Sequence, residues 1–304
     1  MATFMLNKGK CKPFKSIEGQ LDLLIQRGLV VGDRDNALDI LSRTNYYRLS
    51  AYSLTLRKGN SFYDGITFDN IYELYRFDDA FRIIILEYSS YIEIAFRTYI
   101  SYEHSKKYGP LGYMDSINFS NSNFFAHMLL DITNEIKRSD DAFVEHHKRD
   151  LDSVFPIWVA LECSSFGNIS KMFKNMIPAD KKLIAHKYYN VHHSYVSNWL
   201  QVCVYARNIA AHGGRFYNRR LKSVPPKIRS KYADLIDVEK AFSMIYVIQK
   251  LLPTKALSES LRDDLNALFA KYPFAKKSHL GFPDNWMDIL VDEDTNHSFE
   301  YHVK

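Results

Sequence analysis

The sequence predicts an all-α protein. Glycine and proline are sparse, with 12 and 9 in 304 residues, so helix-breaking positions are few. Long stretches place apolar residues at a period of 3.6 instead of alternating them, and this period is typical of amphipathic helices. No internal repeat and no low-complexity tract is apparent. We therefore expect a chain that is almost entirely helical.

The composition is that of a globular protein, with 46% apolar and 25% charged residues. Its unusual feature is 21 Tyr and 20 Phe, most of which we expect to pack between helices, although tyrosine rings also suit stacking on unpaired bases. A net charge of +5 is mild and does not by itself indicate a polyanionic partner.

The three cysteines, Cys11, Cys163 and Cys203, lie far apart and form no CxxC pair. Neither a disulfide framework nor a cysteine zinc site is indicated, and a reducing compartment fits. Residues 1–15 contain no apolar stretch of signal-peptide length, and the longest aliphatic run, residues 83–86, is far too short for a membrane span. We expect a soluble, cytoplasmic protein.

Residues 1–68 are expected to form an N-terminal helical element. A first helix begins near Ser16 and ends by Gly28, and Asp33 or Asp35 is placed to cap a second. Turn residues at 59–61 and 64–65 then mark a candidate boundary.

The clearest helix is predicted over residues 69–106. Apolar residues repeat along it at alternating spacings of three and four, and Asp78 occupies the one polar position in the stripe. The pairs Asp78–Arg82 and Glu93–Arg97 are spaced four apart with the acid first, which favours ion pairing. Either these charges form a solvated face, or they mark an interior cleft or a partner surface. The stripe consists of Ile71, Leu74, Phe81, Ile85, Tyr88, Ile92, Ala95 and Tyr99.

Further helices are predicted on both sides of the segment that carries the candidate chemistry. Residues 69–222 are expected to form the helical core and residues 223–304 a helical extension that packs back on it or shapes an RNA path. The predicted helices lie near residues 126–150, from 156 to about 165–167, at 169–176 and 178–189, and, in the extension, at 238–252 and 256–272.

Residues 195–212 predict a helix with one apolar and one polar stripe, and Gly213 and Gly214 directly after it predict its end. His212 is therefore expected at the helix C-terminus. The apolar stripe is Val196, Trp199, Leu200, Cys203, Ala206 and Ala210. The polar stripe is Ser197, Gln201, Tyr205, Asn208 and His212.

The end of this helix brings together residue types that suit phosphodiester chemistry. Asn208 and His212 share a face, and the long side chain of Arg207 can reach it. In RNA the 2′-hydroxyl is a built-in nucleophile, so no metal-bound water is needed. We expect His212 to act as general acid/base, Arg207 to stabilise the charge on phosphate, and Asn208 to orient one of them. An arginine and a histidine five apart are a weak signal alone, but the asparagine and the glycine stop make it more specific.

A basic tract follows the motif. Seven Lys and Arg residues lie between positions 215 and 231, and no acid occurs from 213 to 233. Phe216 and Tyr217 lie among these basic residues, and Tyr232 directly follows the last of them. Basic residues interleaved with aromatics are typical of RNA-binding surfaces, although a solvated basic loop is the alternative. The residues expected to contact RNA are Arg215, Tyr217, Arg219, Arg220 and Lys222.

Several separated segments, roughly from residue 12 to 220 and with a trace at 281–283, resemble one family in the right order. They are residues 45–52, 74–78 with Arg82, 92–93 with 97–98, 156–158, 165–167 and, most specifically, 199–220. Together they resemble the abortive-infection Abi proteins of the AbiD/AbiF type, members of the HEPN superfamily that is defined by an Arg-x(4–6)-His motif.

The resemblance implies a HEPN-like helical bundle and a metal-independent endoribonuclease toxin of phage defence, without cofactor. It also implies a homodimer that unites two Arg/His sets, and for some members a regulatory non-coding RNA. Arg207, Asn208 and His212 match the motif without departure. The candidates for supporting the site or closing the dimer are Asp78, Arg82, Glu93 and Arg97.

Two alternatives stay open at this point. HEPN-type bundles also occur as non-catalytic RNA-binding modules, and the intact Arg-Asn-x-x-x-His run favours the enzyme over this reading. A histidine metal site is disfavoured, because the neighbours His146–His147 and His192–His193 point to different helix faces and no HExxH or Cys/His cluster accompanies them.

Overall fold

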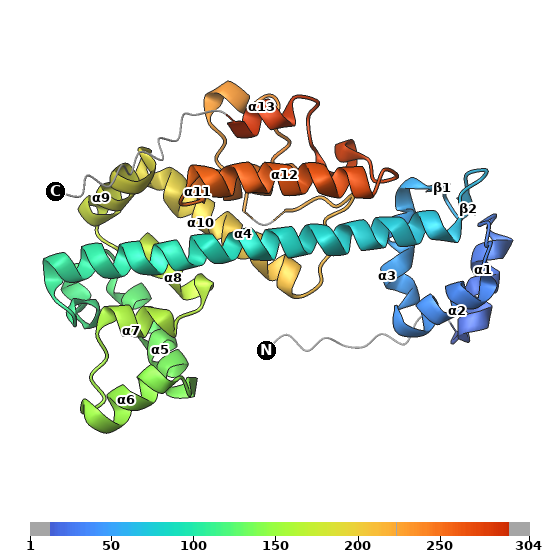
Figure 1. Cartoon of the computed structure of the whole chain (residues 1–304). Helices are drawn as coiled ribbons and strands as arrows, with labels where there is room; N and C mark the ends of the chain where they lie inside the picture. The colour runs from blue at the N-terminus through green and yellow to red at the C-terminus, as the bar shows by residue number, and fades with distance from the viewer. Residues whose placement is uncertain (1–12, 223, 292–304) are drawn as a thin grey trace. The chain divides into compact units, whose positions relative to one another are not determined.

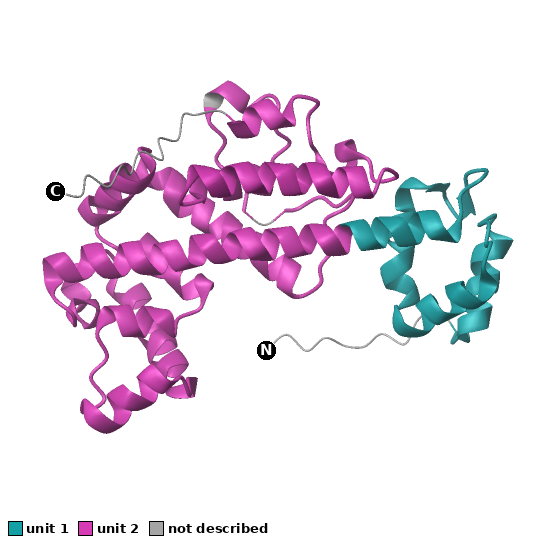
Figure 2. Cartoon of the chain, viewed as in Figure 1, with its two compact units in different colours: residues 1–77 teal, residues 78–304 magenta. Residues whose placement is uncertain are grey.

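The computed structural model describes residues 13–222 and 224–291 (Figure 1). Over these residues the chain forms thirteen α-helices, a few short 3-10 turns and one small β-hairpin, so the predicted all-α class is confirmed. The chain divides into two compact units, residues 1–77 and 78–304 (Figure 2). The division falls inside the longest helix, and the predicted extension from residue 223 belongs to the second unit.

Unit 1 contains the capped helices that the sequence predicts. The Ser16 hydroxyl accepts the N–H of Gly19, and the Asp33 carboxylate accepts the N–H of Asn36, so each satisfies a free donor of a first turn. The short hairpin was not predicted, because its strands are two residues long and carry no alternating pattern. The elements are α1 (Ile17–Gln26), α2 (Arg34–Arg43), α3 (Tyr46–Ser50), β1 (Arg57–Lys58) and β2 (Ser61–Phe62).

Helix α4 (Phe68–Tyr108) exceeds the predicted bounds by one residue at its start and two at its end. Its predicted apolar stripe is buried except at Tyr99, which is half-buried. Asp78 is fully buried within the stripe, so this carboxylate belongs to the interior of unit 2 and not to a solvated face.

The remaining helices of unit 2 follow α4 in the sequence and include α10, the helix predicted to carry the chemistry. They are α5 (Ser122–Arg138), α6 (Ala142–Asp150), α7 (Ile157–Glu162), α8 (Phe166–Asn175), α9 (Pro178–Tyr189), α10 (His193–Ala211), α11 (Ala241–Leu251), α12 (Lys255–Lys271) and α13 (Trp286–Val291). Helix α10 packs against α8, α9 and α11, and α11 is buried along its whole length. The segment after residue 223 therefore supplies a central part of the core.

Two predicted helix bounds are wrong. The single helix expected near residues 126–150 is two helices, because Ser139 is extended and hydrogen-bonds Asp141, which interrupts the helical ladder. Ser165-Phe166-Gly167 was expected to end a helix, but α7 ends at Glu162 and α8 begins at Phe166 with Ser165 as its N-cap residue. Serine occurs both at the end of a helix and as the N-cap residue of the next one, and the sequence alone does not distinguish these two positions.

Near the C-terminal end of α4, His104 is 1% exposed, and neither ring nitrogen has a hydrogen-bond partner among the described residues. Its ring packs on Tyr108 and Phe119, with centroids 4.8 and 5.5 Å away. Burial lowers the pKa of His104 to about 4; nearby Asp180 opposes this and Lys107 adds to it. The folded state therefore holds this histidine neutral under conditions in which an exposed one is charged.

We predict that this histidine makes folding sensitive to mild acid. Its pKa is lower in the folded than in the unfolded chain, so the unfolded chain binds more protons. The stabilisation is complete above about pH 6.5 and is lost as the pH falls toward 4, by on the order of 2–3 kcal/mol. Urea unfolding at pH 7 and 4.5 measures the loss, and His104→Gln is expected to reduce it. An equal acid dependence in both proteins would contradict the prediction.

Candidate functional site

The end of α10 is closed by two glycines. The Gly213 N–H donates to the Ala210 carbonyl (3.0 Å) and the Gly214 N–H to the Ile209 carbonyl (2.7 Å), which is a Schellman motif with His212 as C-cap. Gly213 has φ +63°, a conformation that favours glycine. A Cβ on Gly214 would lie 2.8 Å from Cγ2 of Ile209, so this position excludes a side chain. The predicted helix stop is confirmed.

The motif side chains lie at the surface of this helix end. Asn208 and His212 are exposed, and the Arg207 side chain is 28% exposed. Nη1 of Arg207 donates to Oδ1 of Asn208 (3.2 Å). The His212 ring has no hydrogen-bond partner among the described residues. The apolar stripe of α10 is buried and its polar stripe is at least partly exposed, as expected.

One carboxylate holds Arg207 from the neighbouring helix. Oε2 of Glu93 on α4 accepts a hydrogen bond from Nη2 of Arg207 (3.3 Å), while its Oε1 accepts one from Nη2 of Arg97 (2.7 Å). The Arg97 guanidinium also donates to the Ser164 carbonyl (2.8 Å). The Glu93 side chain is 14% exposed, so this charge is shielded from water and shared by two guanidiniums. Glu93 and Arg97 therefore belong to the motif's surroundings.

A second cluster anchors the loop that follows the motif. The buried Asp78 carboxylate accepts the backbone N–H groups of Phe216 (3.1 and 3.2 Å) and Tyr217 (2.7 Å). It also pairs with Arg82 at 3.0 Å, and Arg82 itself is 5% exposed. Asp78 and Arg82 thus fix where the chain goes after His212, whereas Glu93 and Arg97 orient Arg207. The four candidate supporting residues form two clusters with different tasks.

Residues 39–218 match the sequence profile of the Abi-like protein family, which is more than half of the chain. The chain belongs to this family. Searches of curated proteins and of solved structures gave no match. The matched region of this Abi-like protein includes the motif and both supporting clusters, and it ends just after the Asp78-anchored loop. Family membership indicates a role in abortive infection.

Tyr217 was expected to contact RNA, and the structure corrects this. Its side chain is 1% exposed, and its hydroxyl hydrogen-bonds Nδ1 of His279 (2.7 Å). Burial raises the pKa of Tyr217 to about 12. Phe216 and Tyr232 are buried as well, so none of the aromatic residues in the basic tract offers a face to a base. Sequence gave no signal of this, because the partner His279 lies 62 positions away.

The basic residues of the loop differ in what they do. Nη1 of Arg215 donates to the carbonyls of Tyr217 (2.6 Å) and Asn218 (3.2 Å), so this side chain shapes the loop. Arg219 donates to the Arg215 carbonyl (3.3 Å). Arg220 pairs with Glu239 yet is mostly exposed, and Lys222 is exposed. Among these four, Arg220 and Lys222 are the cations most accessible to a polyanion.

Among the described residues no group of three or more His, Cys, Asp or Glu side chains is placed to hold a metal ion. His146 instead pairs with Asp150 (2.9 Å). Within residues 13–222 and 224–291, no helix combines the length and the apolar character that a bilayer crossing requires.

The anchoring role of Asp78 predicts a large effect of a conservative change. Asp78→Asn removes the charge that compensates the buried Arg82 and disturbs both loop contacts, so we expect a loss of about 3–5 kcal/mol in the free energy of unfolding. Asp79→Asn is the matched control, because Asp79 pairs with the same arginine but is 58% exposed; its cost should stay below about 1 kcal/mol. Urea denaturation measures both. Equal effects of the two substitutions would show that Asp78 does not anchor the loop.

Proposed function

We propose that this Abi-like protein is a metal-independent endoribonuclease of the HEPN type, with Arg207, Asn208 and His212 as its catalytic residues. The supporting observation is an accessible imidazole and a partly exposed guanidinium at the same helix end, the latter oriented by Glu93. A guanidinium supplies two parallel donors to phosphate oxygens, and an imidazole transfers protons near neutral pH.

The proposed reaction uses the RNA's own nucleophile. The 2′-oxygen attacks the adjacent phosphorus, the bond from phosphorus to the 5′-oxygen breaks, and a 2′,3′-cyclic phosphate and a 5′-hydroxyl result. The 2′-hydroxyl loses one proton and the 5′-oxygen gains one, so the reaction has no net uptake or release of protons. His212 transfers the proton, Arg207 stabilises the added negative charge on the phosphorane, and Asn208 orients the imidazole or the phosphate.

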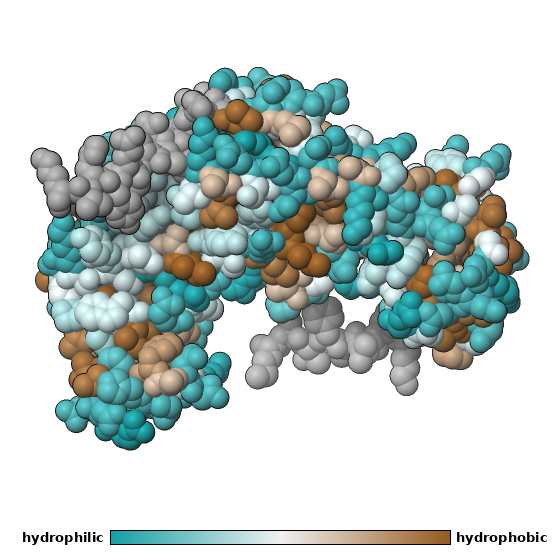
Figure 3. Space-filling view, viewed as in Figure 1, coloured by the Kyte–Doolittle hydropathy of each residue, from teal (hydrophilic) through white to brown (hydrophobic). Residues whose placement is uncertain are grey.

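In the cell we propose a toxin that acts on RNA in the cytoplasm during phage infection and is restrained by a partner RNA. We also propose a homodimer that unites two Arg/His sets. In support, α4 exposes the large apolar residues Ile83 (60%), Tyr91 (37%) and Ile94 (55%) on one side. The hydrophilic face seen in Figure 3 is likewise interrupted by hydrophobic side chains over the middle of unit 2.

The decisive experiment is RNA cleavage in EDTA with His212→Ala. Removing the proton-transfer group is expected to lower the cleavage rate at least 100-fold. Cleavage of 5′-labelled RNA on gels measures the rate, and end-group analysis should find cyclic phosphates. His127→Ala is the matched control, because His127 is an exposed histidine on α5, outside the motif. Unchanged cleavage by His212→Ala, or 5′-phosphate ends, would rule out this mechanism. If the wild-type protein binds RNA but does not cleave it, the alternative of a non-catalytic RNA-binding module is supported instead.

A second variant tests whether Glu93 positions Arg207. Glu93→Gln keeps the side chain's shape but removes its charge, so the guanidinium is held less firmly and kcat should fall roughly 10- to 100-fold with a smaller change in KM. Glu259→Gln, an exposed glutamate on α12 away from the motif and from the apolar side of α4, should leave both constants unchanged. Thermal melting of both variants separates a positioning defect from a folding defect. A wild-type kcat in folded Glu93→Gln would show that Arg207 needs no such support.

A further inference from the structure

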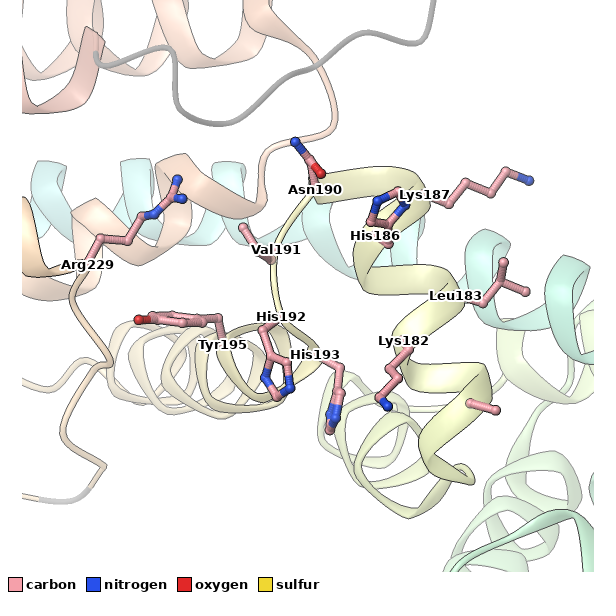
Figure 4. A pocket seen from close by; sticks show the side chains of 11 residues that line it. Lys182, Leu183, His186, Lys187, Asn190, Val191, His192, His193, Tyr195 and Arg229 are labelled. Atoms are coloured by element: carbon pink, nitrogen blue, oxygen red, sulfur yellow. The ribbon is translucent and has the colours of Figure 1, made fainter.

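A groove of about 1060 Å³ lies at the other end of the motif helix, bounded by α9, the link into α10 and the chain near residue 229. Figure 4 shows its side chains, with His192, His193 and Lys182 extending toward the same side. The polar and aromatic residues that line it include Lys182, His186, His192, His193, Tyr195 and Arg229. The sequence analysis assigned no function to these positions as a group, because α9 and the 229 loop meet only in the fold.

The charge of this groove is one-sided. None of its lining residues is acidic. The pKa of His193 is lowered, first by burial and then by His192, Lys181, Lys182 and Lys227, with no carboxylate acting in the opposite sense. The nearest acid on α9, Asp180, is buried and bonded by Lys107 and Tyr108. Lys187, which also lines the groove, pairs with Glu103, and Glu103 is not itself a lining residue. A lining that contains lysine and arginine but no acid attracts anions.

A polar path joins the groove to the motif. His193 precedes the polar stripe of α10 by one more step of four residues, so polar side chains follow one another at spacings of four, four, four, three and four from His193 to His212. Every member is at least partly exposed. The 19-residue helix is ~28 Å long, which corresponds to roughly eight nucleotides of a stacked strand at ~3.4 Å each.

We propose that this groove binds the phosphate backbone of the RNA strand that is cleaved at the opposite end of α10, and so selects RNA long enough to span both. The inference rests on the proposed ribonuclease function. Lys182 and Arg229 neutralise phosphates, and the partly exposed ring of Tyr195, packed on Trp199 (5.4 Å), offers a base a stacking surface.

The test is RNA binding by full-length protein in a His212→Ala background, which prevents cleavage. Fluorescence anisotropy with a labelled RNA of about 16 nucleotides is measured over a range of salt concentrations. The double variant Lys182→Ser/Arg229→Ser should bind at least about tenfold more weakly at low salt, and its slope of log K against log salt should fall by about 1.4, or 0.7 for each lost phosphate contact. Lys137→Ser, an exposed lysine on α5, is the matched control and should change neither quantity.

The outcomes separate this inference from the ribonuclease proposal. A double variant that melts like its parent yet keeps the parental affinity and slope overturns the groove assignment, whatever the wild type cleaves. The groove assignment is also overturned if inorganic phosphate or a mononucleotide competes with the labelled RNA as strongly as unlabelled RNA does, at equal phosphate concentration. The groove would then be a site for a small anion. Loss of binding in the double variant while wild-type protein cleaves no RNA supports the groove and refutes only the nuclease.

Discussion

The buried carboxylate of Asp78 joins helix α4 to the loop that follows the candidate catalytic motif. A fully buried charge is tolerable only when it is paired and hydrogen-bonded, and here Arg82 and two backbone N–H groups of the loop after α10 meet that need. Because the loop is held at Phe216 and Tyr217, the chain must turn directly after His212. Gly213 and Gly214 thus end α10 at a fixed place on the surface, where the motif side chains are exposed.

A second charge balance acts one turn before the helix end. Glu93 shares its two oxygens between Arg207 and Arg97, and Arg97 is held in turn by the Ser164 carbonyl. Since the carboxylate is divided between two cations, Arg207 is oriented without being fully neutralised. Part of its guanidinium remains available to solvent and to a phosphate. The arrangement suits a residue that must be positioned and still meet an anionic substrate.

Cations occur at both ends of α10, and they differ in character. At the C-terminal end several arginines are committed to backbone carbonyls or to Glu239, so the basic tract is partly a structural device. At the N-terminal end the groove collects lysine, arginine and histidine side chains from separate elements without any lining acid. The groove is therefore an electropositive region that the sequence analysis did not identify. The basic tract of residues 215–231, which it did identify, offers fewer accessible cations than its number of Lys and Arg residues implies.

Local features were predictable from the sequence. The caps at Ser16 and Asp33, the long α4 and the end of α10 all follow from side-chain-to-backbone bonds or from periodicity within a few turns. The break at Ser139 and the start of α8 at Phe166 were not, because serine at these positions is compatible with more than one local structure. The two-residue strands of the hairpin are too short to carry a periodic pattern at all.

The sequence alone determined that Arg207, Asn208 and His212 lie together, since residues one and four apart on a terminating helix are neighbours whatever surrounds them. Only the tertiary structure decided that Glu93 reaches Arg207, that Asp78 holds the loop, and that Tyr217 is buried against His279. These contacts join residues between 62 and 139 positions apart. Helix packing sets such distances, and no local pattern encodes them.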